Sequence, residues 1–596
     1  MDAAPNLRPP QTRGVAAPFT PVHAVRHPDD VRALETLPLA QRVSVRSTYE
    51  LIRNSAAAFG DKTALTFLPT AEPDGPSVRW SYARLLQGVH QTANALHRLG
   101  LRSSDAVAVL LPGCLEYHLA LWGGAAAGIV QPLNPLLSDD KLVALMNAAQ
   151  VRVLIAWGDE TSEGDAGLWA KSQRIRTRVP TLKTVLRVSP WGERLPADLP
   201  PGCADFADLI AHEPDTHLVS GRDIQATDIA AYFHTGGTTG APKLARHSHG
   251  AQVFTAWACV QLQGVRVDDV AINGYPLFHV AGVLPGSLTS LSAGAETVIP
   301  TPALFRNKAV IAHFWKLVEV HKATVLSGVP TVLAALANVP VGDADISTLR
   351  YGRTGAAPMP ADLAARLKQK IGIQVHESLG MTEMAGISTI TPPGMNAPPG
   401  CVGIRLPYTQ WRVVALDEQG GASDRDCATG EPGMVLFKSP NVFSGFLDEA
   451  DNAKAFTPDG WLATGDLGFI DGQERLHLSG RSKDLIIRSG HNIDPKVIED
   501  ALTAHPAVQL CAAVGAPDPY AGELPVVFAT LIPGATATED ELLAFVCAGV
   551  DEPPARPKRV TILETMPMTN VGKIYKPDLR VLAAQAVAAA QAPAAS

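Results

Sequence analysis

Short runs of aliphatic residues alternate with amphipathic segments through most of this chain. Residues 106–111 (AVAVLL) and 152–156 (RVLIA) are apolar runs with the length of buried strands. Residues 82–99 and 139–149 carry apolar side chains at i, i+3 and i+4 spacing, which predicts two helices. A similar alternation recurs from residue 251 to about 373. This pattern favours an α/β fold with largely parallel sheets.

The pattern changes twice toward the C-terminus. Residues 400–480 have more glycines and turn signals and shorter apolar runs, which predicts a small β-rich subdomain. Beyond Lys483, strand-like runs and two helical segments predict a small α+β domain, which the family resemblance described below implies to be mobile. We therefore expect an α/β protein with an arm at 1–45 and a large domain at 46–482. The large domain has two parallel-type α/β subdomains plus the β-rich one, and the small C-terminal domain spans 483–596.

Composition excludes several classes of protein. The chain is 46% hydrophobic and 18% charged, as in ordinary soluble globular proteins. Its net charge of −8 gives no broad basic surface for nucleic acid, so a nucleotide would need a local positive pocket. The N-terminal residues lack the apolar core of a secretory signal, and the seven cysteines show no paired spacing. We expect a cytoplasmic protein, monomer or homodimer, with reduced thiols.

One long stretch, residues 271–295, contains no charged side chain. It is long enough to cross a bilayer. It nevertheless holds Asn273, Pro276, His279, Pro285 and four glycines, which argue against a membrane helix. We expect a strand followed by a loop inside a soluble domain, with no integral membrane segment.

A glycine- and threonine-rich segment follows the strand predicted at 228–233. Its sequence is Thr-Gly-Gly-Thr-Thr-Gly-Ala-Pro-Lys at 235–243. Glycines let the backbone approach an anion, threonine hydroxyls add donors, and Lys243 supplies positive charge. Because Gly240 is followed by Ala-Pro-Lys, the segment is not a Walker A loop, and it is not a GxGxxG motif either. We interpret it as a loop for the β- and γ-phosphates of ATP.

Six further motifs follow the phosphate loop in one order along the chain. They are PLFHVAG (276–282), TGAAP (354–358), ESLGMTE (377–383), GWLATGD (460–466), GRSKD (480–484) and TNVGKI (569–574). Together the seven motifs resemble the adenylate-forming superfamily of acyl-CoA synthetases, firefly luciferases and peptide-synthetase adenylation domains. The resemblance covers residues 46 to 582. One departure is Leu244, since the family's glycine-rich loop usually ends in glycine there.

The resemblance implies an ATP site. The phosphate-binding residues are Thr235, Gly236, Gly237, Thr238, Thr239, Gly240 and Lys243. The adenine-binding residues are Gly355, Ala356, Ala357, Pro358, Glu377, Ser378, Leu379 and Gly380; Leu379 stands where the family usually has an aromatic ring. Asp466 is expected to accept hydrogen bonds from both ribose hydroxyls, and Arg481 is expected to donate one.

The resemblance also implies four catalytic residues, Lys573, Thr382, Glu383 and His279. Lys573 is the adenylation lysine, Thr382 contacts the α-phosphate, and His279 lies beside the acyl carboxylate. Glu383, together with Thr239, is expected to bind Mg²⁺, a cation that takes oxygen ligands.

Two further positions belong to the second half of the reaction in that family. Lys483 corresponds to the hinge about which the small domain rotates, and Gly490 to a glycine that lines the tunnel for the pantetheine arm of CoA. The implied activity is that of an acid–thiol ligase. ATP and a carboxylic acid give an acyl-adenylate and pyrophosphate, and CoA then takes the acyl group and releases AMP.

Two alternatives remain open. One is a free-standing ligase that loads a separate acyl carrier protein instead of CoA. The other is a nucleotide-binding protein without activity, against which the joint presence of Lys573, Glu383, Asp466 and Arg481 argues.

The identity of the acid is the least constrained feature. We expect its pocket to be formed by residues 279–282, 328–330 and 384–386, which are small or apolar apart from His279. Such a lining favours an uncharged acyl chain or ring over an amino acid with a free ammonium group.

Overall fold

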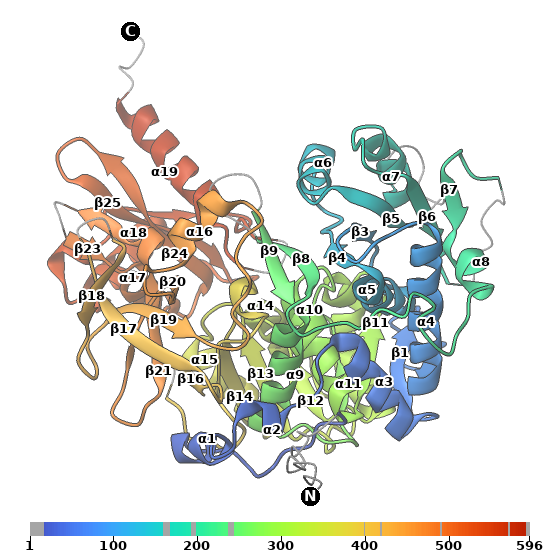
Figure 1. The fold of residues 1–596 in the computed structure, drawn as a ribbon. Coiled ribbons are helices and arrows are strands. Elements are labelled where there is room, and N and C mark those ends of the chain that lie inside the picture. Colours follow the sequence, from blue (N-terminus) through green and yellow to red (C-terminus); the bar gives the residue numbers. More distant parts are fainter. Residues whose placement is uncertain are drawn as a thin grey trace, which may run out of the picture.

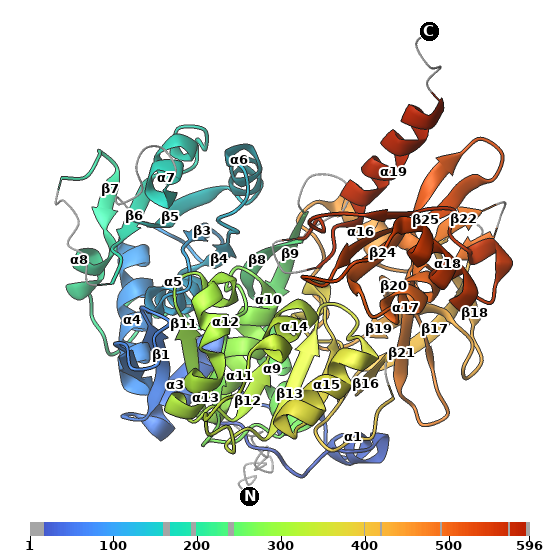
Figure 2. The ribbon, with the colours of Figure 1, turned by 180° about the vertical axis from the view of Figure 1, so that it is seen from behind.

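Three sheets organise the chain (Figure 1). The computed structural model describes residues 17–158, 167–191, 198–235, 243–398, 400–417, 420–488, 491–569 and 573–591. In both views the seven-stranded sheet and the C-terminal elements lie at opposite sides of the molecule (Figure 2). No helix in the described ranges is long and apolar enough to cross a membrane.

The seven-stranded sheet is parallel except at one edge. In spatial order its strands are β7 (Cys203–Asp205), β6 (Thr184–Val188), β5 (Val151–Trp157), β3 (Ala106–Leu110), β4 (Ile129–Pro132), β8 (Ile229–Thr235) and β9 (Lys243–Ser248). Only β8 and β9 pair antiparallel. The connecting helices are α4 (Tyr82–Arg98), α5 (Leu115–Ala127), α6 (Asp139–Ala148), α7 (Leu168–Arg176) and α8 (Phe206–Ala211). The predicted α/β class is confirmed, and β8 ends at the phosphate-loop segment.

The second sheet is a path of fourteen strands that changes character at β14. Its strands are β18 (Ala422–Asp426), β17 (Gln410–Leu416), β19 (Gly433–Lys438), β20 (Leu462–Ile470), β21 (Leu476–Arg481), β16 (Cys401–Arg405), β15 (Thr389–Ile390), β14 (Val375–Leu379), β13 (Tyr351–Gly355), β12 (Val325–Ser327), β10 (Val270–Ile272), β11 (Glu296–Pro300), β1 (Thr63–Leu68) and β2 (Val78–Ser81). From β14 to β1 the neighbours are parallel, and from β14 to β18 they are antiparallel. The antiparallel part contains the β-rich region predicted at 400–480.

Helices cover the parallel part of this path. They are α3 (Thr48–Phe59), α9 (His249–Gln263), α12 (Lys308–Ala312), α13 (Phe314–His321), α14 (Pro330–Asn338) and α15 (Ala361–Ile371), with a 3-10 turn η2 at Leu304–Arg306. Serine hydroxyls fix several helix starts, because an N-cap oxygen accepts a backbone N–H that the helix itself leaves unpaired. Ser47, Ser81, Ser138 and Ser248 each accept the N–H three residues later.

The loop predicted within 271–295 is present only at 273–279, and the chain from Val280 to Ala293 is helical instead. After β10, the chain forms α10 (Val280–Val283), a π-helical turn η1 (Leu284–Leu288) and α11 (Thr289–Ala293). Nearly all of this segment is buried, so it shows no polar face from which helical periodicity could be recognised. Pro285 is the second residue of the π-turn, which continues directly from α10, so its missing N–H falls where the helical hydrogen-bond pattern changes.

The N-terminal segment is buried more deeply than the predicted surface arm. It contains α1 (Pro28–Leu34) and α2 (Leu39–Arg42). Phe19 and Leu34 are fully buried in the main core. The Glu35 carboxylate accepts hydrogen bonds from the guanidinium of Arg405 in β16 and from the Tyr408 N–H, the latter at 2.6 Å. The segment therefore ties the large domain together across both halves of the long sheet.

The C-terminal part forms its own small sheet and core. Its strands are β23 (His491–Ile493), β22 (Ile486–Arg488), β25 (Gly522–Leu531), β24 (Val508–Asp518) and β26 (Val560–Ile562). Its helices are α17 (Pro495–Thr503), α18 (Glu539–Gly549), η5 (Pro553–Ala555) and α19 (Lys576–Gln591). A 3-10 turn, η4 (Ser482–Asp484), precedes them. The first strand of this part, β22, therefore begins at Ile486, two residues after the turn ends.

Candidate active site

Two hairpin strands bring a carboxylate and a guanidinium together at the edge of the β-rich region. Asp466 in β20 and Arg481 in β21 are register partners. The Arg481 Nε lies 2.7 Å from the Asp466 Oδ1, and Asp466 attracts the guanidinium strongly enough to raise the pKa of Arg481. The other carboxylate oxygen, Oδ2, is buried and has no hydrogen-bond partner within the described residues. One oxygen of Asp466 is thus fixed by the protein, while the other remains available to accept from a ligand hydroxyl.

Lys573 enters the same neighbourhood from the C-terminal part. Thr569 fixes its backbone, since the Thr569 N–H donates to the Lys573 carbonyl at 2.6 Å and the Lys573 N–H to the Thr569 hydroxyl at 3.0 Å. Burial lowers the pKa of the Lys573 ammonium to about 8, with further lowering by Arg481, while Asp466 and Glu383 act in the opposite direction. Within the described ranges its ammonium lies within 4 Å of no carboxylate. It is a desolvated cation held near two acidic groups.

Thr382 and Glu383 lie in a short 3-10 turn, η3 (Thr382–Met384), directly after β14. The turn is fixed by backbone contacts: His247 Nε2 lies 2.8 Å from the Thr382 carbonyl, and the Phe443 N–H donates to the Glu383 carbonyl at 2.9 Å. Burial raises the pKa of the Glu383 carboxyl, whereas Arg481 and Lys573 lower it. The turn therefore places Glu383 in the same electrostatic cluster as Asp466 and Lys573.

His279 completes this cluster. It is the N-cap of α10, and its Nδ1 accepts the Ala281 N–H at 3.2 Å. Burial and the nearby Lys573 lower the pKa of the imidazole to about 3, so the ring is neutral near pH 7. Because Nδ1 accepts, the proton of the neutral ring lies on Nε2. His279 can then donate one hydrogen bond to an anionic oxygen.

The loop predicted to bind adenine follows β13. Ala356 has a φ of 73°, in the left-handed region that costs energy for alanine. Glu377 Oε2 accepts the Met359 N–H at 3.0 Å, and burial raises the pKa of this carboxyl. Gly380 has room for no side chain, since a Cβ there would lie 2.1 Å from the Gly386 carbonyl oxygen. Leu379, in contrast, is buried in the core of the β-rich region with Met384, so its side chain packs inward.

The phosphate loop is described only at its two ends. Thr235 and Lys243 are paired where β8 and β9 meet. Residues 236–240, predicted to bind phosphate, and Gly490, predicted to line the CoA tunnel, lie outside the described residues. The Lys243 ammonium is 2.6 Å from the Asp451 carboxylate and 5.2 Å from the centre of the Phe446 ring. In this structure Lys243 is therefore held by Asp451, at the start of α16 (Glu449–Ala455).

Two protein-family models match the chain. The model of the AMP-binding enzyme covers residues 52–447, and that of the AMP-binding enzyme C-terminal domain covers residues 497–573. The chain belongs to the AMP-binding enzyme family.

Curated relatives and solved structures agree with this family. The chain is 35% identical to the marinolic acid–CoA ligase of Pseudoalteromonas sp. (strain SANK 73390), over 94% of this chain and 85% of that protein. It is 30% identical to 4-coumarate–CoA ligase 1 of Solanum tuberosum, over 85% and 90% of the two chains. The structure of ATP-bound MatB from Rhodopseudomonas palustris superposes with a TM-score of 0.76 at 28% identity, covering 90% of this chain and 99% of that one. The anthranilate CoA ligase AuaEII with anthranoyl-AMP gives a TM-score of 0.79 at 25% identity, covering 93% and 99%.

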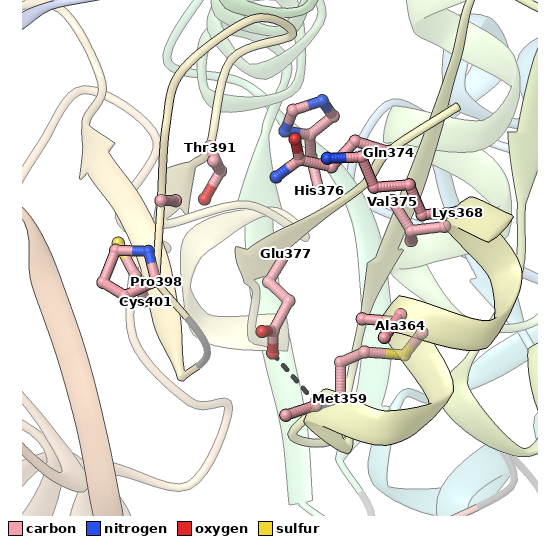
Figure 3. A pocket seen from close by; sticks show the side chains of 13 residues that line it. Met359, Ala364, Lys368, Gln374, Val375, His376, Glu377, Thr391, Pro398 and Cys401 are labelled. Carbon is pink, nitrogen blue, oxygen red and sulfur yellow. Dashed lines mark hydrogen bonds between the residues drawn. The ribbon is translucent and has the colours of Figure 1, made fainter. Parts of the chain in front are cut away.

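This AMP-binding enzyme has a small cavity next to the loop predicted to bind adenine (Figure 3). The cavity measures about 170 Å³ and lies between α15, β14 and the segment before β16. Figure 3 shows the Glu377 carboxylate directed to Met359, with His376 on the other side of the cavity. A volume this small is below that of drug-sized ligand pockets, which hold about 300–1,000 Å³. The cavity therefore adds room next to the loop and is too small for a whole nucleotide.

One site residue was missed by the sequence reasoning. His234, directly before Thr235, stacks on Phe278 with ring centroids 6.2 Å apart, and its buried Nε2 has no partner in the described part of the chain. It also contributes to the lowered pKa of His279. The signal was present in the sequence, because His234 belongs to the strand that ends in the phosphate loop.

Proposed function

We propose that this AMP-binding enzyme is an AMP-forming acyl-CoA synthetase. The observation that supports this proposal best is the position of Lys573. The C-terminal part delivers a buried cation into electrostatic range of Glu383, Asp466, Arg481 and His279, all of which belong to the large domain. The relatives named as CoA ligases favour CoA as the acyl acceptor.

The first half-reaction joins two anions. A carboxylate oxygen attacks the α-phosphorus of ATP, the bond to the bridging oxygen breaks, and pyrophosphate leaves. Positioning and charge neutralisation therefore contribute more than proton transfer. We assign Lys573 to the oxygens that develop charge, Thr382 to the α-phosphate, and the Nε2–H of His279 to the incoming carboxylate.

The nucleotide itself is held by residues of the large domain. The free Oδ2 of Asp466 accepts from the ribose hydroxyls, while Arg481 fixes the other carboxylate oxygen. Residues 355–358 and the backbone of 377–380 lie along the adenine. Lys243 is 2.6 Å from Asp451 here, so a role on the β- and γ-phosphates requires it to exchange that carboxylate for phosphate oxygens.

The donor set fits magnesium bound through a single protein carboxylate. Glu383 carries a carboxyl whose pKa is raised by burial, and the described residues contain no group of three or more acidic, His or Cys side chains suited to hold a metal. Mg²⁺ commonly binds one or two carboxylates and takes its other ligands from phosphates and water. We propose that Glu383, with Thr239, would hold the ion, which would supply positive charge near the departing pyrophosphate.

The second half-reaction requires Lys573 to leave. The CoA thiol attacks the acyl carbon, the carbon–oxygen bond to AMP breaks, and the thiol proton passes to solvent. In the arrangement proposed for adenylation, Lys573 would lie beside the reacting carboxylate and block the thiol. We propose that the C-terminal domain rotates at Lys483 in η4, which leads directly from the Arg481 strand into that domain.

Pyrophosphate release tests this proposal. The purified chain is assayed with ATP, Mg²⁺ and a panel of fatty, aromatic, alicyclic and dicarboxylic acids, and then with CoA, an acyl carrier protein or an amine as acceptor. We expect acid-dependent pyrophosphate release followed by thioester formation with CoA. Release of pyrophosphate without a CoA thioester, but with carrier loading, would assign the alternative acceptor. The absence of release with every acid would refute the proposal.

A further inference from the structure

Two arginines three residues apart are paired very differently. Arg350, just before β13, donates to the Asp269 carboxylate from Nε at 3.0 Å and from Nη2 at 2.7 Å. Arg353, within β13, donates from Nε to the Ser327 hydroxyl at 3.0 Å and from Nη1 to the Gln263 side-chain oxygen at 2.7 Å. Neutral acceptors satisfy hydrogen bonds and leave the charge uncompensated. Within the described residues no carboxylate lies within 4 Å of the Arg353 guanidinium.

Burial makes this uncompensated charge unusual. Charged side chains inside a protein are normally paired, because removing an ion from water is costly. Strand β13 lies in the interior of the long sheet, between β12 and β14, and Gln263 at the end of α9 reaches its face. Ser327 and Gln263, its two hydrogen-bond partners, are both buried. The part of the guanidinium that contacts Ser327 and Gln263 is therefore surrounded by buried residues.

Arg353 still keeps accessible surface. It is half-buried, although Tyr351 and Thr354 on the same strand are buried. Tyr275 is half-buried as well, and burial raises the pKa of its hydroxyl. Arg353 and Tyr275 share the Ser327 hydroxyl as a neighbour, so the two side chains form one polar boundary that keeps some accessible surface.

This boundary connects to the proposed reaction site. The Ser327 hydroxyl lies 3.4 Å from the Tyr275 hydroxyl, and Tyr275 precedes His279 by four residues on one segment. Four residues span at most about 14 Å when fully extended. The Gly328 N–H also donates to the Arg353 carbonyl at 3.3 Å, so the polar cluster adjoins the 328–330 segment expected to line the acyl pocket. Tyr275 and His279 are therefore no more than about 14 Å apart, a separation that a medium-length acid can span.

We propose that Arg353, with Tyr275, Ser327 and Gln263, recognises an oxygen acceptor at the distal end of the acyl substrate, and a second carboxylate above all. The inference rests on the proposed acid-activating function and specifies its substrate class. A guanidinium binds a carboxylate through two parallel hydrogen bonds, and a carboxylate supplies the charge that Arg353 lacks. This polar end modifies the expectation of a wholly small or apolar pocket, and it agrees with the exclusion of a free ammonium group.

Matched acids provide the test. Rates of acid-dependent ATP–pyrophosphate exchange are measured for octanoic, 8-hydroxyoctanoic and octanedioic acids, with the six- and ten-carbon series as length controls. We expect the wild-type enzyme to use the dicarboxylic acid at least about tenfold better, in kcat/KM, than the monoacid of equal length. Arg353→Met should lower kcat/KM for the dicarboxylic acid about 10- to 100-fold and leave that for the monoacid unchanged or higher.

Conservative variants separate recognition from folding. Arg353→Lys keeps the charge and loses the fork, so it should show an intermediate preference, and Arg353→Gln keeps hydrogen bonding without charge. Thermal unfolding of each variant is measured alongside, with the surface variant Arg53→Met as a matched control. An equal loss for both acids, or a wild-type preference for the monoacid, overturns the inference. Absence of exchange with any acid, including those of the broad panel, refutes the proposed function instead.

Discussion

Asp466 and Arg481 meet within one hairpin, whereas Lys573 reaches the same site from the C-terminal domain. The hairpin pair is assembled in advance: the strands set the register, and the ion pair closes at 2.7 Å. Lys573 has a fixed backbone turn but no carboxylate within 4 Å among the described residues, and its pKa is lowered to about 8. A residue that must depart between two half-reactions gains nothing from a strong partner. The difference agrees with our proposal that the large domain holds the nucleotide and that the small domain supplies charge only for the first step.

Removal of Lys573 should have the largest effect on activity, and that effect should be confined to the first half-reaction. In Lys573→Ala we expect adenylation to fall on the order of 10²–10³-fold, since a cation about 4 Å from an anion contributes roughly 4 kcal/mol at an effective dielectric near 20. Thioester formation from supplied acyl-AMP should remain close to the wild-type rate. ATP–pyrophosphate exchange and a thioesterification assay measure the two steps separately. Equal losses in both steps would contradict a temporary role.

Asp466→Asn tests the role of the Asp466–Arg481 pair, which the hairpin holds in place. The variant loses the ion pair with Arg481 and one charged acceptor for the ribose. A hydrogen bond to a charged group contributes about 1.5–3 kcal/mol, so kcat/KM for ATP should fall about 10- to 100-fold. Both half-reactions should suffer, because acyl-AMP carries the same ribose. A loss confined to adenylation would show that Asp466, like Lys573, acts only in the first half-reaction, and would contradict its assignment to nucleotide binding in both.

The pH dependence of adenylation should report the charge on Lys573. Lys573 acts as a cation, and its pKa of about 8 means that the free enzyme loses this charge as pH rises through 8. We expect kcat/KM to fall about tenfold per pH unit above that value. Bound phosphates stabilise the ammonium, so the corresponding fall in kcat should occur at higher pH. In Lys573→Ala the alkaline fall should disappear, and its persistence would assign it to another group.

The sequence pattern predicted the parts of the fold that depend on local periodicity. The helices expected at 82–99 and 139–149 end within one residue of α4 and α6, and the run at 106–111 forms β3. Within 271–295 the expected loop is confined to 273–279, and the helical part at 280–293 has no sequence signal, since complete burial erases the polar face of a helix. The predicted parallel sheets followed from the alternation of strands and helices alone.

The sequence motifs name a set of candidate site residues but not the contacts that those residues make. Motif order brought Lys573, Glu383 and Asp466 into one hypothesis, and their mutual electrostatic effects agree with it. The ion pair of Lys243 with Asp451 joins positions 208 residues apart in sequence, and no local pattern encodes it. The contact between Arg353 and Gln263, 90 residues apart, is of the same kind.

The smallest expected effect concerns the connection between the two regions. Arg580 in α19 donates to the Lys483 carbonyl at 3.0 Å and lies 2.9 Å from the Asp484 carboxylate, so it joins the C-terminal domain to the proposed hinge turn. This pair is partly exposed and contributes about 0.5–1 kcal/mol. Arg580→Ala should therefore slow adenylation about 2- to 5-fold, because the arrangement with Lys573 in the site becomes less populated. Thioester formation from supplied acyl-AMP should be unchanged or slightly faster. Single-turnover measurements of both steps test this prediction. A slower second step would show that the Arg580 contact stabilises the rotated arrangement used for thioester formation, and not the arrangement with Lys573 in the site.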